Sequence, residues 1–524
     1  MTDMPHSKAL PAHAARQGGK GDEHTPHPAK KKSYSGTALA ALFWTHSRRG
    51  IAALIALPTA VILARLLSPA EFGIAAAALF FGRLAARLSS LGMGSALIRT
   101  KVLRDDHLAT VFVFSAAMGI VTYVVLVLSG GAIGRFYGND AIGSTMPVVG
   151  LLFLIPSFFT VQQALLSRDL RYRELATSGT VEMLVTSVSA CIMAWAGLGF
   201  WSLVLGGPLG EAAKGAFSAY YARWRPSVRW SRAAFRELLS FGFGSYTTTI
   251  LVQLAGSIDN LVIGRVLGVT ALGFYDKGYS VAHRLFNKLS AGGPTLSFRI
   301  FSIIEDEPER FRRAYRKVIL ASTLVGYPAF AVLVALAHPL FLVLFGEQWL
   351  PAVVPFQILC LAAPFNLTNG YASAAAQARG WVWSQAWRQV VVVALIASGV
   401  YAASPWGVTG AAAAVLGATV TGWVLMQHLL RSATHFTWSD ILGPQVPALT
   451  CSIALVSLLT LGQRLLLQLW PALEPWQLLL VLGTAGCAAY LLFLRYSRFT
   501  EASSLVHETL TAVSPKLARF VRAA

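Results

Sequence analysis

The sequence has few charged residues for its length. Of its 524 residues only 13% are Asp, Glu, Lys or Arg, and 55% are hydrophobic, whereas about 25% charged residues are usual in a soluble domain. This composition excludes an ordinary soluble fold. Apolar stretches of about 20 residues, the length of a membrane-crossing helix, recur between Ile51 and Phe493. We therefore expect an all-α polytopic membrane protein.

Cysteine and recognisable chemical motifs are also scarce. The four cysteines stand far apart in apolar stretches, without the spacing of a disulfide framework or a metal site: Cys191, Cys360, Cys451 and Cys487. The sequence has no phosphate-binding glycine loop, no zinc-hydrolase motif and no serine nucleophile elbow. It also has no loop long enough to form a catalytic domain. We expect no metal, no cofactor and no enzyme activity.

Basic residues are distributed unevenly among the loops. They gather in the termini and in alternate loops, whereas the intervening loops hold only Arg65, Arg135, Arg265 and Arg464. Since basic loops stay in the cytoplasm, both termini are expected there, with an even number of spans. The hydropathy pattern predicts about fourteen spans, at 38–66, 72–98, 108–130, 143–167, 175–197, 200–222, 241–267, 270–298, 317–344, 352–378, 384–403, 405–430, 443–466 and 474–495.

The chain repeats itself weakly at a shift of 200 positions. The stretch "ARLLSPAEFG" at 64–73 corresponds to "GRVLGVTALG" at 264–273, so that Arg65 pairs with Arg265 and Gly73 with Gly273. A parallel repeat of this kind is a common transporter plan, although convergent hydropathy alone is an alternative explanation. The repeat predicts two pseudo-symmetric six-helix lobes around a central cavity.

The expected organisation follows from these spans and loops. It comprises a disordered basic cytoplasmic tail (1–37), an N-lobe (38–222), a basic cytoplasmic linker (223–240), a C-lobe (241–430), an appended helix pair (443–495) and a cytoplasmic amphipathic tail (496–524).

The second helix of each lobe carries two cations four residues apart. Arg83 and Arg87 form one pair, and Arg284 and Lys288 form the other. A spacing of four places both cations on one helix face, and cations within membrane helices usually face a protein interior or a wet cavity. We expect a basic cavity wall that binds an anion such as a phosphate group. Arg48 either extends this wall or anchors its helix at the cytoplasmic face.

Carboxylates within the spans are few. Asp259 has no basic residue within a helical turn along the chain, so it is a candidate for ion coupling, and a structural counter-ion to a cation on another helix fits equally well. We expect Glu211 and Lys214 to form an internal ion pair. Asp276 and Lys277 are expected to be a solvated or paired structural feature near the outer end of their helix.

Several polar and helix-breaking residues carry weaker signals. The run "AGGP" at 291–294 and Pro156 are candidates to bend their helices. Polar side chains in these spans usually form hydrogen bonds between helices, and lining a hydrophilic cavity is the alternative for Asn366, Asn369 and Gln389. The tryptophans and arginines of "QARGWVWSQAWR" at 377–388 indicate an interfacial belt.

Four stretches together resemble a known family. They are "ILARLLSPAEFGIAAAAL", "LGMGSALIR", "IDNLVIGRVLGVTALGFYDKGYSVA" and "VLFGEQWLPAVVPFQILCL". These stretches are similar to the Wzx-type polysaccharide exporters, lipid-linked oligosaccharide flippases of the multidrug/oligosaccharidyl-lipid/polysaccharide (MOP) superfamily. The resemblance runs from about residue 36 to 495, and it matches the two basic pairs by helix position.

The resemblance implies both a mechanism and a location. Twelve core helices and two appended ones would flip an undecaprenyl-pyrophosphate-linked repeat unit across the bacterial inner membrane, by alternating access through a basic cavity. Its implied partners are this lipid, the surrounding membrane lipids, and a polysaccharide polymerase with its export machinery, but no nucleic acid. The exported product would be an exopolysaccharide, a capsule or an O-antigen.

Other classes stay open at this point. A drug exporter of the same superfamily would carry an acidic cavity, and the scarcity of carboxylates in the first lobe argues against it. A membrane-embedded polymerase or ligase would need a sizeable outer loop, whereas the loops expected on the outer face are short. A scaffold protein for a synthesis machine is compatible with the sequence.

Overall fold

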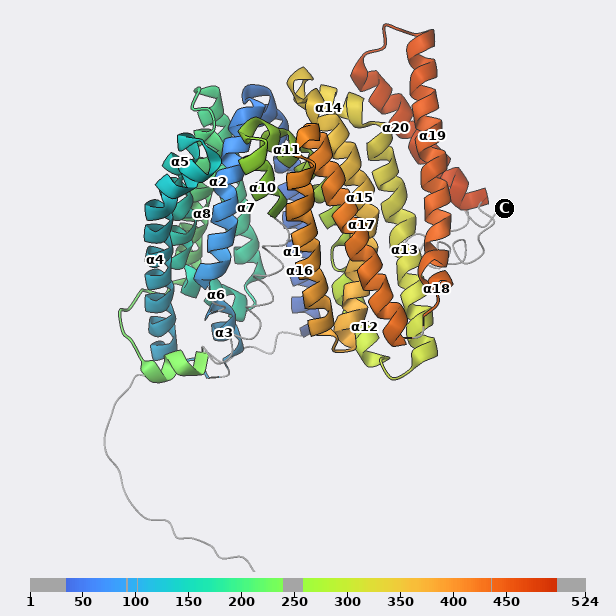
Figure 1. Ribbon diagram of the computed structural model, residues 1–524. Coiled ribbons are helices and arrows are strands. Elements are labelled where there is room, and N and C mark those ends of the chain that lie inside the picture. The colour runs from blue at the N-terminus through green and yellow to red at the C-terminus, as the bar shows by residue number, and fades with distance from the viewer. Residues whose placement is uncertain (1–33, 91–92, 101, 239–257, 435, 497–524) are drawn as a thin grey trace, which may run out of the picture.

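The computed structural model describes residues 34–90, 93–100, 102–238, 258–434 and 436–496 (Figure 1). Within these ranges every regular element is helical, and the expected fold class is confirmed. Nine of the described helical segments are long and apolar enough to cross a membrane, so the chain is a multi-pass membrane protein. The number of fourteen spans stays a prediction. The tails at 1–33 and 497–524 and most of the expected span 241–267 lie outside the described ranges.

Eight helices whose bounds lie within the described residues make up most of the first half of the chain. They are α1 (Tyr34–Leu66), α2 (Pro69–Ser90), α3 (Met93–Arg99), α4 (Asp105–Tyr137), α5 (Asp140–Ser157), α6 (Thr160–Arg168), α7 (Tyr172–Trp195) and α8 (Trp201–Ala222). α4 packs on α5, α7 packs on α8, and α1 packs on α7. The tight turn between α4 and α5 has a local cause. Gly138 ends α4 with a φ of 65°, and the Asn139 side chain accepts a hydrogen bond from the backbone N–H of Ala141.

The second half contains α10 (Ile258–Val266), α11 (Val269–Ser290), α12 (Gly293–Ile303), α13 (Pro308–Ala335), α14 (Ala337–Phe345), α15 (Val353–Ala378), α16 (Val382–Ala402) and α17 (Gly407–Thr434). A 3-10 helix, η1 (Glu347–Ala352), precedes α15. The remaining described helices are α18 (Trp438–Leu442), α19 (Val446–Leu469) and α20 (Pro475–Tyr496), and α19 and α20 pack against α13 and α14. In Figure 1, α4 and α5 lie at one side of the molecule, α19 and α20 at the other, and α2, α10 and α11 between them.

The internal repeat is visible in the helix boundaries. α2 and α11 each have 22 residues, and they begin at Pro69 and Val269. The preceding helices end at the corresponding residues, Leu66 and Val266. α2 and α11 pack directly against each other. Alanines of α2, such as Ala75 and Ala78, share a buried cluster with Tyr275 of α11, so the largest core region joins the two halves.

Within the described residues, three expected spans are interrupted. The predicted bend at 291–294 is confirmed, because Gly292 has a φ of 81° and separates α11 from α12. The helix containing Pro156 ends at Ser157. The single span expected at 317–344 is wrong in one respect, because Leu336 separates α13 from α14. Pro339, at the start of α14, has no backbone N–H to continue the hydrogen bonds of α13.

Candidate functional site

The two halves meet at the end of the bundle where α2 and α11 begin. We call this region the junction; it comprises residues 60–73 and 258–277 and the side chains that contact them. Arg65, at the end of α1, donates from Nη2 to the carbonyl of Val343 at 2.5 Å and from Nε to Leu344 at 3.4 Å, both in the last turn of α14. Arg65 thus binds carbonyls at a helix C-terminus, where a cation is favourable. Its counterpart Arg265 lies 5.6 Å from the ring centre of Phe136, at the end of α4. Each repeated arginine thus contacts the other half.

Side chains of η1 also hold α1 at the junction. Trp349 Nε1 donates to the carbonyl of Ala64 at 2.8 Å, and Gln348 Nε2 donates to the same carbonyl at 2.7 Å. Trp349 is fully buried, and its ring meets that of Phe72 edge to face at 5.1 Å. These contacts tie α1 and α2 of the first half to the segment between α14 and α15 of the second.

Lys277 of α11 is the most deeply buried basic residue of the junction. Only 4% of it is exposed, so of the two expected alternatives, a solvated or a paired structural feature, the solvated one is wrong. Its Nζ lies over three aromatic rings at 4.3–4.8 Å and 3.4 Å from the carbonyl of Ala60; the rings belong to Phe72, Phe345 and Trp349. Desolvated cation–π contacts of this kind stabilise by about 2 kcal/mol or more. α11 supplies the cation, and both halves supply the rings.

The expected basic wall is only partly within the described residues. Arg83 and Arg87 lie in α2, and their side chains are outside the described part of the structure. Arg284 and Lys288 lie one turn apart on α11, and both side chains are exposed. Because α11 packs against α2, α15 and α17, it is an interior helix.

Arg48 lies on α1 against the first half. A Cβ atom placed on Gly179 of α7 would lie 2.6 Å from the Arg48 Cζ, so the guanidinium packs on α7. Arg48 itself is exposed. This position neither assigns it to the expected wall nor identifies it as an anchor.

The predicted ion pair between Glu211 and Lys214 is confirmed and includes a third residue. Lys214 Nζ lies 3.3 Å from Glu211 Oε1 and 2.9 Å from Glu182 Oε2. All three side chains are partly buried. One lysine thus links two carboxylates across the contact between α7 and α8, which accounts for the location of these charges within apolar helices.

Asp259 of α10 is 6% exposed and accepts two hydrogen bonds. Tyr275 Oη donates to its Oδ2 at 2.7 Å, and the backbone N–H of Asn260 donates to Oδ1 at 2.9 Å. Among the described residues no basic side chain forms an ion pair with Asp259, so the alternative of a structural counter-ion finds no partner there. The carboxylate is held by hydrogen bonds at one wall of a cavity.

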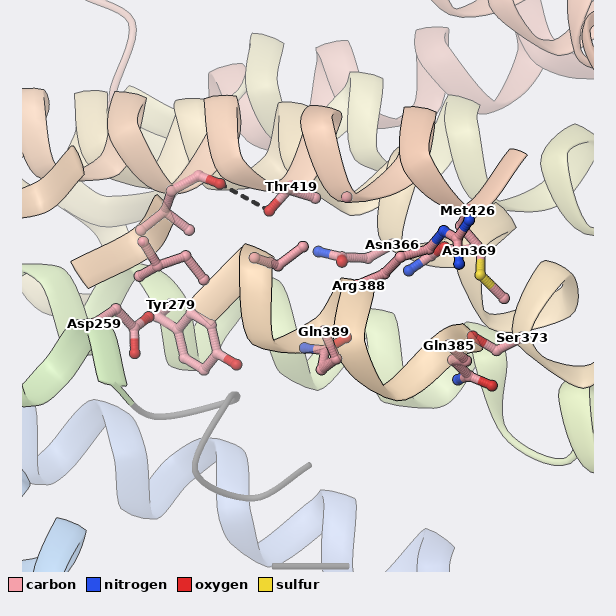
Figure 2. A pocket seen from close by; sticks show the side chains of 14 residues that line it. Asp259, Tyr279, Asn366, Asn369, Ser373, Gln385, Arg388, Gln389, Thr419 and Met426 are labelled. Carbon is pink, nitrogen blue, oxygen red and sulfur yellow. Dashed lines mark hydrogen bonds between the residues drawn. The ribbon is translucent and has the colours of Figure 1, made fainter. Parts of the chain in front are cut away.

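This cavity has a volume of about 290 Å³ and lies between α10, α11, α15, α16 and α17 (Figure 2). Polar side chains from these helices line most of it, including Asp259, Tyr279, Asn366, Asn369, Ser373, Gln385, Arg388, Gln389 and Thr419. The alternative prediction for Asn366, Asn369 and Gln389, that they line a cavity, is the one observed.

Sequence reasoning missed other members of the cavity wall. Arg388 was assigned to an interfacial belt, but it lines the cavity and donates to the carbonyls of Ser384 and Leu425, at 2.5 Å and 3.1 Å. Trp383 of the same stretch is 87% exposed, as the belt requires. Gln385 and Ser373 were not singled out. The sequence feature that identifies them is the helical spacing of polar residues within apolar runs. These residues are 366, 369 and 373 on α15 and 385 and 389 on α16.

The fold and these features define a class of protein, a polytopic helical membrane protein with two related halves. A structure described as "Lipid II flippase MurJ, inward closed conformation" is similar to the chain with a TM-score of 0.67 and 14% sequence identity, and the match covers 90% of this chain and 100% of the other. An inward-facing multidrug resistance MATE family transporter of the MOP superfamily has a TM-score of 0.57 at 17% identity, covering 73% and 95%. At these identities the likeness concerns the fold.

A family model described as "Polysaccharide biosynthesis protein" matches residues 62–354, and the chain belongs to this family. The expected resemblance is thereby confirmed. Among its relatives, "Lipopolysaccharide biosynthesis protein WzxC" of Escherichia coli is 25% identical over 306 residues, covering 57% of this chain and 61% of the relative. "Succinoglycan biosynthesis transport protein ExoT" of Rhizobium meliloti is 27% identical over 306 residues, covering 58% and 62%. The chain thus spans about three fifths of the length of the curated relatives it matches.

Proposed function

We propose that this protein flips a lipid-linked oligosaccharide, carried on undecaprenyl pyrophosphate, from the cytoplasmic to the periplasmic leaflet of a bacterial inner membrane for polysaccharide export. Family membership and the transporter fold support this function. The basic loops support a topology with both termini in the cytoplasm. On this topology the junction lies at the periplasmic end. The protein would act as a transporter rather than an enzyme and would deliver its product to a polymerase.

The observation that carries the proposal is the exposure of Arg284 and Lys288 on an interior helix. A cation within the apolar region costs about 2.5–3.5 kcal/mol on insertion scales, which favours a position facing water or an anion. A pyrophosphate group is such an anion, and arginine binds phosphate oxygens in bidentate geometry. The prenyl tail would stay in the bilayer while these side chains accompany the charged headgroup.

The contacts between the halves support alternating access. Arg65, Lys277 and Trp349 all join the halves at the junction, whereas Arg284 and Lys288, farther along α11, are exposed. Such a distribution suits a state closed at the periplasmic end. Transport would then require the junction contacts to separate and re-form in each cycle.

Asp259 is our candidate for coupling this cycle to an ion gradient. It is buried, it lies on the cavity wall, and its two described hydrogen bonds come from groups without charge. A carboxylate in this setting can bind a proton or a cation and change its charge during the cycle.

Loss of the protein in its native host tests the function. A flippase mutant should accumulate single lipid-linked repeat units in the inner leaflet, where a membrane-impermeant oxidant applied to spheroplasts does not reach the sugars. Accumulation in the outer leaflet would instead indicate a polymerase or ligase. The variant Arg83→Ala/Arg87→Ala should reproduce the flippase defect at wild-type abundance in the membrane, and normal surface polysaccharide in this variant would contradict the basic wall.

A further inference from the structure

The cavity between α15 and α16 contains amide groups that the protein itself does not satisfy. Asn366 and Gln389 form no hydrogen bond with any residue that the structure describes, and the Oδ1 of Asn369 is buried without a partner. An unpaired polar group in an apolar setting costs about 1–3 kcal/mol. Membrane helices normally avoid this cost by pairing such groups with one another. This cost applies to Asn369 Oδ1, which is buried, whereas Asn366 is exposed and Gln389 is half-buried, so their amides are open to the cavity. One buried unpaired oxygen beside two amides without a described protein partner therefore indicates a ligand.

The neighbouring polar groups of the cavity already have hydrogen-bond partners in the protein, in contrast to the three amides. Gln385 Nε2 donates to Ser373 Oγ at 3.0 Å. The guanidinium of Arg388 donates to two backbone carbonyls, and its Cζ lies 4.6 Å from the ring centre of Trp387. Figure 2 shows Asn366 and Asn369 of α15, Gln389 of α16 and Tyr279 of α11 around the cavity.

The chemistry of the free groups fits an uncharged ligand rich in hydroxyls. Each amide offers both an acceptor oxygen and a donor NH₂, and a sugar hydroxyl likewise donates and accepts. The charged groups of the wall have protein partners, since Arg388 is held by carbonyls and Asp259 by Tyr275. The volume of about 290 Å³ lies at the lower end of the range of about 300–1,000 Å³ for small-molecule sites. A cavity of this volume suits a single sugar ring rather than a long oligosaccharide chain.

We propose that this cavity binds one neutral sugar residue of the transported oligosaccharide, through Asn366, Asn369 and Gln389. The proposal rests on the proposed function and adds a second point of recognition to it. The basic side chains of α2 and α11 hold the pyrophosphate, whichever sugars it carries. The amide cavity lies in the second half alone and distinguishes a glycosylated lipid from the bare carrier.

Binding to the full-length protein in lipid nanodiscs separates the two points of recognition. The probes are undecaprenyl pyrophosphate and the undecaprenyl-pyrophosphate-linked oligosaccharide extracted from the native host. The variant Asn369→Leu/Gln389→Leu should bind the glycosylated lipid about tenfold more weakly than the wild type, because two sets of hydrogen bonds are lost. Its affinity for the bare carrier should be unchanged. Gln357→Leu is the matched control, because this amide lies on the same α15 but donates to Val334, outside the cavity.

Each outcome decides between the two proposals. Equal affinity of wild type and double variant for the glycosylated lipid overturns the sugar site and leaves the flippase proposal standing. A wild type that binds neither lipid overturns both. A cavity that holds only ordered water predicts no difference between the two probes, which also overturns the sugar site. If the double variant does not fold, Asn369→Ser and Gln389→Ser can be measured singly, each with an expected loss of about threefold.

Discussion

Gly73 of α2 lies against Gly273 of α11, its counterpart in the repeat. A Cβ atom on Gly73 would lie 3.1 Å from the backbone nitrogen of Gly273, and a Cβ on Gly273 would lie 3.2 Å from that of Gly73. Each Cβ would also collide with a carbonyl oxygen of the opposite helix, that of Val269 or of Pro69. The two halves are therefore in backbone contact, and only glycine permits this approach.

Replacing either glycine by leucine should push the halves apart. Overpacking of this kind costs about 1–3 kcal/mol, so Gly73→Leu and Gly273→Leu should each lower the melting temperature of the purified protein. Gly417→Leu in α17 is the control, because its Cβ would meet nothing within 4 Å. Wild-type stability in both junction variants would contradict the backbone contact.

The buried Lys277 should matter more for transport than for stability. Lys277→Met keeps the length of the side chain and removes the charge that burial disfavours. We expect a melting temperature at least as high as that of the wild type, since removing the charge also removes its desolvation penalty of several kcal/mol, which offsets the loss of about 2 kcal/mol from the cation–π contacts. Polysaccharide export should fall, because a junction without this charge is entirely apolar at position 277 and separates less readily in water. Full export by an equally abundant, more stable variant would show that the junction does not open during transport.

Lys214 should be essential for the stability of the first half. Lys214→Met leaves Glu182 and Glu211 without their shared cation, and loss of one partner from a buried ion pair costs about 3–5 kcal/mol. The lower end applies here, because the three side chains are only partly buried. The triple variant Glu182→Gln/Lys214→Met/Glu211→Gln should recover most of the melting temperature, and failure of this rescue would mean that the cluster has another role.

Asp259 should decide the response to an ion gradient. Asp259→Asn keeps an acceptor for the Tyr275 hydroxyl but cannot change its charge, so transport in proteoliposomes should no longer respond to an imposed proton or sodium gradient. Tyr275→Phe removes the hydrogen bond and keeps the carboxylate, and its transport should still respond. An unchanged response in Asp259→Asn would remove this residue from the coupling mechanism.

The sequence predicted the features that arise locally. Apolar length indicated the helices, the repeated phrase at 64–73 and 264–273 indicated the two related halves, and glycine at 292 indicated a break. The spacing of Glu211 and Lys214 predicted a pair on one helix. Each of these depends on residues within a few turns of one another, or on a comparison of the chain with itself.

The features it did not predict depend on residues far apart in the chain. The sequence left open whether Lys277 is solvated or paired, because its aromatic partners, at 72, 345 and 349, come from three separate segments. Arg388 looked like part of an interfacial belt because its neighbours in sequence are tryptophans, whereas a carbonyl of α17 holds it at the cavity. Which amides stay unpaired likewise depends on how α15 and α16 face each other.

The central claim, that the protein moves a lipid-linked oligosaccharide between leaflets, is tested most directly in proteoliposomes. The substrate is the undecaprenyl-pyrophosphate-linked oligosaccharide from the native host, and the readout is the fraction of its sugar that a membrane-impermeant oxidant destroys. With the wild-type protein nearly all of the sugar should become accessible, whereas Arg284→Gln/Lys288→Gln should leave the inner-leaflet pool protected, as in protein-free liposomes. The control variant is Arg310→Gln, which removes an arginine that pairs with Glu307 at the exposed start of α13. This variant should behave as the wild type. If the wild type also leaves the inner-leaflet pool protected, the protein is not a flippase for this lipid.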